Sequence, residues 1–252
     1  MVEQIEIAMD GGTSEAYVAR PENVALEGKG PFPGVLFFID AIGLRPRIAE
    51  MAQRIADWGY VVLAPNVLWR SGTAAETSPQ VDLREAGARE EFMGEAMKRV
   101  RALSTPLAEA DIPTYLATLR GLDDVDGGPV GTTGYCMGAR LAVRAAALDE
   151  DVAAVGGFHG GGLVTDADDS PHLGLARSDA EFYFGHADQD RSMPPEAVEA
   201  LGRALEDAGL AATNEVYAGA GHGYTMSDTS AYDEAATERH FAELEELFDR
   251  AL

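Results

Sequence analysis

The chain has 252 residues, 46% of them hydrophobic, and a formal net charge of −24. A chain of this length can bury the core of one α/β domain, and no apolar run in it reaches the roughly 18 residues of a membrane span. The negative charge argues against nucleic acid and anionic membranes as partners, because their phosphates would be repelled.

The cysteine count and the N-terminus indicate a cellular location. Cys136 is the single cysteine, so no internal disulfide can form. The first residues lack the basic start and apolar stretch of a signal peptide. We therefore expect a soluble cytoplasmic protein. We interpret the acidity as a solvated surface that aids solubility, with a salt-rich cytoplasm as the alternative.

The first third of the chain reads as strands with one helix. Residues 5–9 and 16–20 predict two short strands joined by a hairpin loop at 10–14. The continuous apolar run 35–39 is typical of a central parallel strand. Apolar residues at helical spacing over 48–56 predict a helix that ends before Gly59, and a strand follows over 60–64.

Residues 66–112 interrupt this alternation with a loop and a polar helical stretch. We predict an insertion here, either over the functional site or elsewhere on the surface; substrate selectivity often resides in such segments. Alternation then resumes, and we find neither a repeat nor a second domain. The chain therefore reads as a single domain over 1–252. The later elements are expected as strands at 128–133 and 152–158 and helices at 139–148, 196–205 and 232–251.

The motif Gly134-Tyr135-Cys136-Met137-Gly138 lies between an apolar strand and an amphipathic helix. Strand, sharp turn and helix describe a nucleophile elbow, with sulfur in place of the usual serine oxygen. The flanking glycines suit a turn too tight for side chains, and the helix N-terminus favours a thiolate. A lone cysteine is more often a buried apolar residue, but this context favours a nucleophile.

A cysteine nucleophile needs a base and an acid that orients the base. In folds with such an elbow, the acid and then the base follow the nucleophile along the chain. Asp188 follows one apolar strand and His222 follows a later one, so both lie where parallel sheets place active sites. Asp190 competes with Asp188 for the role of the acid. His186, Asp188 and Asp190 could also hold a metal, but no matching His or Cys set exists elsewhere, so we expect no metal site.

The other histidines have simpler interpretations. His159 ends a strand and is expected to line the pocket. His186 shapes the turn before the acid, His172 lies in a loop, and His240 lies in a helix among charges and is expected at the surface. Only His222 occupies the position after the last strand that the base requires.

With these motifs the chain resembles the dienelactone hydrolase family. This family of α/β-hydrolases uses a Cys-His-Asp triad. The resemblance implies an α/β-hydrolase fold, a three-layer sandwich with a mainly parallel eight-stranded sheet that is antiparallel at its N-terminal edge. It also favours Asp188 as the acid, through the pattern Gly-x-x-Asp. The segments that carry it are Phe38-Ile39-Asp40-Ala41-Ile42-Gly43, Gly59-Tyr60-Val61-Val62-Leu63-Ala64-Pro65, Gly134-Tyr135-Cys136-Met137-Gly138, Phe158-His159-Gly160-Gly161, Gly185-His186-Ala187-Asp188 and Gly219-Ala220-Gly221-His222-Gly223.

The expected oxyanion hole has two backbone N–H donors. The elbow supplies the N–H of Met137, and the resemblance implies that of Ala41 as the second. Asp40 stands where well-known family members have a glutamate that contacts the resting cysteine. Asp40 either poises the thiol in the same way or anchors its loop; a carboxylate beside the sulfur would keep the thiol protonated.

Two positions concern the substrate. Met226 stands where the family has an arginine that grips a substrate carboxylate, and Arg70 matches another family arginine or is a surface residue. Because Met226 cannot pair with an anion and the protein is strongly acidic, we expect neutral substrates to be preferred.

The sequence thus predicts an enzyme that hydrolyses a small ester or lactone through Cys136, His222 and Asp188, with no cofactor. Two alternatives stay open: a redox-active thiol protein that uses Cys136, and a non-catalytic binding module on the same fold. Neither the natural substrate nor the oligomeric state follows from the sequence.

Overall fold

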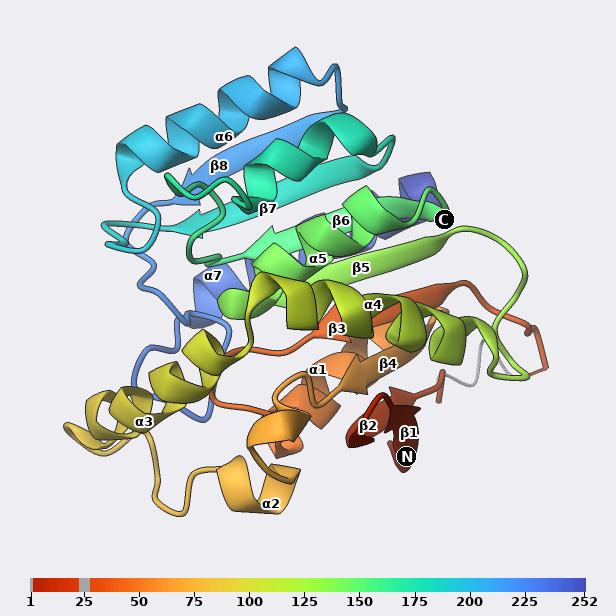
Figure 1. The fold of residues 1–252 in the computed structure, drawn as a ribbon, viewed down its shortest axis with the longest axis horizontal. Helices are drawn as coiled ribbons and strands as arrows, with labels where there is room; N and C mark the ends of the chain where they lie inside the picture. The colour runs from red at the N-terminus through yellow and green to blue at the C-terminus, as the bar shows by residue number, and fades with distance from the viewer. Residues whose placement is uncertain (1, 23–27) are drawn as a thin grey trace.

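The computed structural model describes residues 2–22 and 28–252, and within them it forms one eight-stranded sheet of order β1-β2-β4-β3-β5-β6-β7-β8 (Figure 1). β1 (Glu3–Met9) and β2 (Gly12–Ala19) are antiparallel to their neighbours. The other strands run parallel to one another: β3 (Gly34–Phe38), β4 (Val61–Pro65), β5 (Val130–Tyr135), β6 (Val152–Phe158), β7 (Glu181–Ala187) and β8 (Ala212–Tyr217). The predicted sheet, with its antiparallel edge, is confirmed.

Helices cover both faces of the sheet (Figure 1). α1 (Pro46–Ala56) and α7 (Glu234–Ala251) pack on one face, while α4 (Thr105–Arg120), α5 (Met137–Leu148) and α6 (Pro195–Asp207) pack on the other. This is the expected three-layer arrangement. The shorter elements are η2 (Trp69–Ser71), α2 (Ala74–Thr77), α3 (Ala88–Ala102) and η3 (Pro171–Arg177).

The core follows from the sequence pattern. β3, β4 and β5 are buried at every position, as their apolar runs predict for parallel strands covered on both faces. α1 buries its apolar stripe, including Ile48 and Ile55, against the sheet.

His240 lies inside this core, so its expected surface position is wrong. It has no exposed area, its Nε2 lies 3.2 Å from the Tyr135 hydroxyl, and its ring meets Phe158 edge-on. Burial lowers the pKa of His240 to about 3, so the imidazole is neutral. His240 shares the buried face of α7 with Phe241 and Leu244, which explains its position.

The segment 66–112 contains η2, α2, α3 and the start of α4. Of the two places considered for it, α3 lies by the cavity that contains Cys136, because Met93, Met97 and Val100 line that cavity. Figure 1 shows α3 beyond the ends of the central strands. The excursion from the α/β alternation therefore forms one wall of the site.

Candidate active site

Cys136 lies on the tight turn between β5 and α5, with a φ of 55° that places it in the left-handed region. The flanking glycines are sterically required. A Cβ at Gly134 would lie 2.2 Å from the carbonyl oxygen of Gly138, and one at Gly138 would lie 2.2 Å from that of Phe38. The residue Cys136 is partly exposed and lies at the N-terminus of α5, as the elbow motif predicts.

His222 is paired with Asp190 rather than Asp188. His222 Nδ1 donates to Asp190 Oδ2 across 2.6 Å, and Asp190 Oδ1 accepts from the backbone N–H and the hydroxyl of Ser192 at 2.8 and 2.7 Å. These bonds hold Asp190 so that one oxygen is directed at the imidazole. The sequence analysis favoured Asp188 as the acid, with Asp190 as the alternative.

Asp188, the acid that the sequence favoured, forms no hydrogen bond with His222 in the described chain. It directly follows β7, where its Oδ2 accepts from the N–H of Gly219 at 2.8 Å and its own N–H donates to the carbonyl of Ala220 at 2.7 Å. Asp188 thus ties the end of β7 to the loop that carries His222. Gln189, with a φ of 53°, then turns the chain and brings Asp190 to His222.

The mutual electrostatic interaction of Cys136 and His222 favours an ionised sulfur. Burial raises the pKa of Cys136, but the charge of His222 and its hydrogen bond outweigh burial, so the pKa lies below its ordinary value. Burial lowers the pKa of His222, yet the Cys136 charge and the bond to Asp190 raise it to about 10. The arrangement therefore stabilises a thiolate beside an imidazolium.

Ala41 and Met137, the expected oxyanion donors, both line the cavity with Cys136. Met137 begins α5, and a hydrogen bond from its backbone contributes to the lowered pKa of Cys136. Ala41 belongs to the loop that follows β3. Their backbones come from the two segments that the elbow geometry requires.

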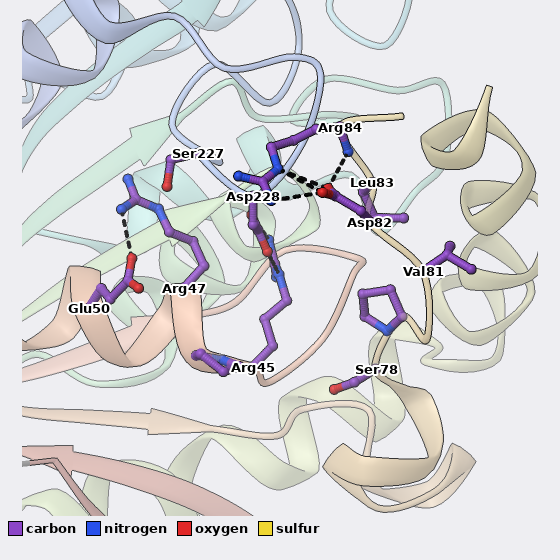
Figure 2. A pocket seen from close by; sticks show the side chains of 12 residues that line it. Arg45, Arg47, Glu50, Ser78, Val81, Asp82, Leu83, Arg84, Ser227 and Asp228 are labelled. Carbon is purple, nitrogen blue, oxygen red and sulfur yellow. Dashed lines mark hydrogen bonds and ion pairs between the residues drawn. The ribbon is translucent and has the colours of Figure 1, made fainter. Parts of the chain in front are cut away.

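Asp40 anchors its loop, which was one of its two expected roles. Asp40 Oδ1 accepts from Arg45 Nη1 at 2.7 Å and from the Ile42 N–H at 3.1 Å, and Oδ2 accepts from Arg45 Nη2 at 3.1 Å. Arg45 also donates through Nε to Asp228 at 2.5 Å, a contact visible in Figure 2. Asp40 lines a small recess with Cys136, and its charge acts to raise the thiol pKa.

The remaining predicted residues divide into two groups. His159 and Met226 line the recess under Cys136; His159 Nε2 lies 2.8 Å from Thr225 Oγ1, and Met226 Sδ accepts from Arg45 Nη2 at 3.3 Å. Arg70 does not line either hollow that contains Cys136, so the structure gives no support to its predicted substrate contact. It forms two hydrogen bonds with Asp111 and stacks on Trp69.

Four arginines that the sequence analysis missed line the cavity of about 530 Å³ above Cys136: Arg89, Arg101, Arg140 and Arg191. Arg140 lies one helical turn after Cys136, so this spacing was a usable signal. Arg89 and Arg101 lie on α3, whose polar sequence gives no indication of which face meets the cavity. The local charge is thus positive, opposite to that of the whole chain.

Two further kinds of feature were expected to be absent, a metal site and a membrane-spanning helix. Within residues 2–22 and 28–252, no group of His, Cys, Asp or Glu is arranged to hold a metal ion. In the same part of the chain, no helix has the length and apolar character needed to cross a membrane. His186 donates from Nε2 to Asn214 Oδ1 at 2.7 Å and forms no hydrogen bond with Asp188 or Asp190 in the described chain.

Comparison with known proteins identifies relatives that match nearly the whole chain. A protein of Methylorubrum extorquens named as a candidate carboxymethylenebutenolidase is 26% identical over 97% of this chain and 79% of its own length. A similarly named protein of Saccharomyces cerevisiae is 28% identical over 96% of this chain and 88% of its own.

Solved structures share the fold. The crystal structure of a candidate dienelactone hydrolase from Klebsiella pneumoniae superposes with a TM-score of 0.83 at 23% identity, covering 99% of this chain and 98% of that one. Residues 14–252 match the sequence model of the dienelactone hydrolase family. The chain, a lactone and ester hydrolase with the α/β-hydrolase fold, therefore belongs to the dienelactone hydrolase family.

Proposed function

We propose that this protein hydrolyses a small ester or lactone through a covalent acyl-cysteine, with Cys136 as nucleophile, His222 as base and Asp190 as the acid that orients His222. The observation that carries the proposal is the geometry of the elbow. A partly exposed cysteine lies at the floor of a cavity, beside an imidazole that is fixed by a buried carboxylate.

The reaction follows from these positions. The Cys136 thiolate attacks the carbonyl carbon, and the backbone N–H groups of Met137 and Ala41 stabilise the oxyanion. When the tetrahedral intermediate collapses, the C–O bond breaks and the leaving oxygen takes a proton from the His222 imidazolium. His222 then removes a proton from water, which attacks the thioester, releases the carboxylic acid and restores the thiolate.

Asp190 holds one tautomer of His222 throughout this cycle, so the imidazole presents Nε2 to the reacting atoms. This role requires an ionised carboxylate. Burial raises the pKa of Asp190, but the hydrogen bond to His222 and those from Ser192 outweigh burial and leave it below its ordinary value.

A matched pair of variants tests the assignment. We expect Asp190→Asn to lower kcat for phenyl acetate by about 10⁴-fold, as loss of the orienting carboxylate does in serine hydrolases. Asp188→Asn, two residues away, keeps a side-chain oxygen for the Gly219 N–H and should cost far less. Cys136→Ala should abolish turnover, and intact mass should show an acylated wild-type enzyme after rapid quenching.

The outcomes separate the alternatives. Full hydrolysis by Cys136→Ala would overturn the covalent mechanism, and a larger loss in Asp188→Asn than in Asp190→Asn would overturn the acid assignment. A redox-active thiol or a binding module would leave all these variants without a hydrolytic difference.

A further inference from the structure

The arginines of this acidic protein differ in whether a carboxylate binds them. In the described chain six form no ion pair, of which four line the cavity over Cys136 and two, Arg99 and Arg177, lie outside it. Most arginines are bound to carboxylates, for example Arg54 to Glu238, Arg120 to Asp149 and Arg250 to Glu181. In the described part of the chain, the four arginines around the cavity over Cys136 form no ion pair with any carboxylate: Arg89, Arg101, Arg140 and Arg191. With 43 acidic residues against 19 basic ones, this concentration of unpaired cations points to a ligand.

Two of these guanidinium groups are partly removed from water. Arg140 is half-buried; burial lowers its pKa, and the nearby Cys136 charge acts in the opposite direction. Arg89 donates through Nη2 to the His222 carbonyl at 2.9 Å, while its Nε is buried without a hydrogen-bond partner. A buried donor without a partner costs free energy, and Arg89 lines the cavity with no carboxylate partner in the described chain to offset that cost.

The acidic residues near the site cannot neutralise this charge, because both are already bound. Asp190 is held by His222 and Ser192, and Asp40 is held by Arg45. Arg45 in turn is shared with Asp228, so it has no capacity left for a ligand. The position at which family members grip a carboxylate is occupied by Met226, so any anion site here uses different residues.

We propose that the cavity over Cys136 selects ester substrates that carry at least two negative charges, with Arg89 and Arg140 beside the reacting groups and Arg101 and Arg191 at the cavity rim. Arg89 and Arg101 come from α3, Arg140 from α5 and Arg191 from the loop after β7, so cations reach the ligand from three segments. A single carboxylate would leave most of them unmatched. The inference rests on the proposed function for the reaction itself, and it replaces the expectation of neutral substrates.

A series of acetate esters with one acyl group and different leaving groups tests this. Phenyl acetate is neutral, 4-acetoxybenzoate is a monoanion, and 5-acetoxyisophthalate and 4-acetoxyphenyl phosphate are dianions. Each kcat/KM is divided by the rate constant for hydroxide-catalysed hydrolysis to remove intrinsic reactivity. We expect the better dianion to exceed phenyl acetate by about tenfold or more, the size of one charge-assisted hydrogen bond. The two dianions distinguish paired carboxylates from a phosphate as the group preferred.

Arginine variants show whether the preference arises in the cavity. Arg140→Ala should lower the ratio of dianion to neutral kcat/KM by about tenfold, mainly through KM. Arg177→Ala is the matched control, because it removes the same charge from outside the cavity. Arg177 is exposed and has no ion pair in the described chain. That control should keep the wild-type ratio. Equal kcat/KM for all four esters, or the same ratio in Arg140→Ala as in the wild type, would overturn the inference.

A binding measurement separates this inference from the proposed function. The product-like dianion 5-hydroxyisophthalate should protect Cys136 from iodoacetamide in the wild type, with about tenfold weaker protection in Arg140→Ala. Protection without hydrolysis of any ester would support the anion site and reject the proposed reaction. Hydrolysis without charge preference and without protection would support the reaction and reject the anion site.

Discussion

Two hollows of similar size, both lined with arginines, differ in how those arginines are neutralised. The first, of about 490 Å³, contains Arg45, Arg47 and Arg84, and each is bound to a carboxylate: Asp228, Glu50 and Asp82 respectively (Figure 2). We call it the paired pocket. The second is the cavity over Cys136, whose arginines have no carboxylate partner in the described chain. Buried Arg45 joins distant segments of the fold, whereas the arginines over Cys136 have no carboxylate partner among the described residues and are available to a ligand.

The paired pocket also supports the active site from behind. Arg45 is buried, and it joins Asp40, on the loop that carries Ala41, to Asp228, which follows the His222 loop. Burial lowers the pKa of Arg45, but the charges of Asp40 and Asp228 outweigh burial and raise it above its ordinary value. This ion trio fixes two catalytic loops relative to each other, so its energetic role is structural.

The largest effect should come from breaking that trio. Arg45→Met leaves Asp40 buried without its cation, and we expect the free energy of unfolding to fall by about 3–5 kcal/mol. Urea denaturation followed by circular dichroism measures it. Arg84→Met, in the same pocket but on an exposed pair, is the control and should remain close to the wild type. A negligible change in the free energy of unfolding of Arg45→Met would show that the ion trio of the paired pocket does not stabilise the fold.

Local patterns in the sequence were enough to select Cys136 and His222 as the proposed nucleophile and base. The glycines around Cys136 are demanded by contacts within a few residues, and His222 follows the last strand of a regular alternation. The sequence did not predict that Asp190 pairs with His222, because Asp188 and Asp190 lie on one turn. The backbone conformation at Gln189, which decides which of them reaches His222, leaves no trace in composition.

Residues that depend on tertiary packing were harder to predict. Arg70 was favoured by its resemblance to a family arginine, but its partner Asp111 lies 41 positions along the chain, on α4. The net charge of −24 suggested repulsion of anions, yet charge is distributed unevenly and the cavity lining has the opposite sign. Two of the residues that the sequence analysis missed or misplaced had a usable local signal: Arg140 lies one helical turn from Cys136, and His240 lies on the apolar face of α7.

A second, intermediate effect concerns the reactivity of Cys136 with pH. Because interaction with His222 outweighs burial and lowers the thiol pKa, alkylation by iodoacetamide should remain fast below the pH at which an ordinary thiol ionises. In His222→Ala the group that lowers the thiol pKa is absent while burial still raises it. The midpoint, which is the pH at which the alkylation rate is half-maximal, should therefore move upward. Arg84→Ala, in the paired pocket, should leave the midpoint in place. An identical midpoint in wild type and His222→Ala would show that the imidazole does not act on the sulfur.

The smallest effect is expected from the residue that matters most for the anion site. Arg140 forms no ion pair in the described chain, so Arg140→Met loses no charge partner, keeps the apolar stem and relieves a half-buried guanidinium of its desolvation. We expect the free energy of unfolding to stay within about 0.5 kcal/mol of the wild type in the same urea experiment. A loss as large as that of Arg45→Met would mean that Arg140 has a structural role, and the two hollows would then differ only in appearance. Wild-type stability combined with a lost preference for dianionic esters would instead mean that the fold does not need this cation, so that its place beside Cys136 is explained by the substrate.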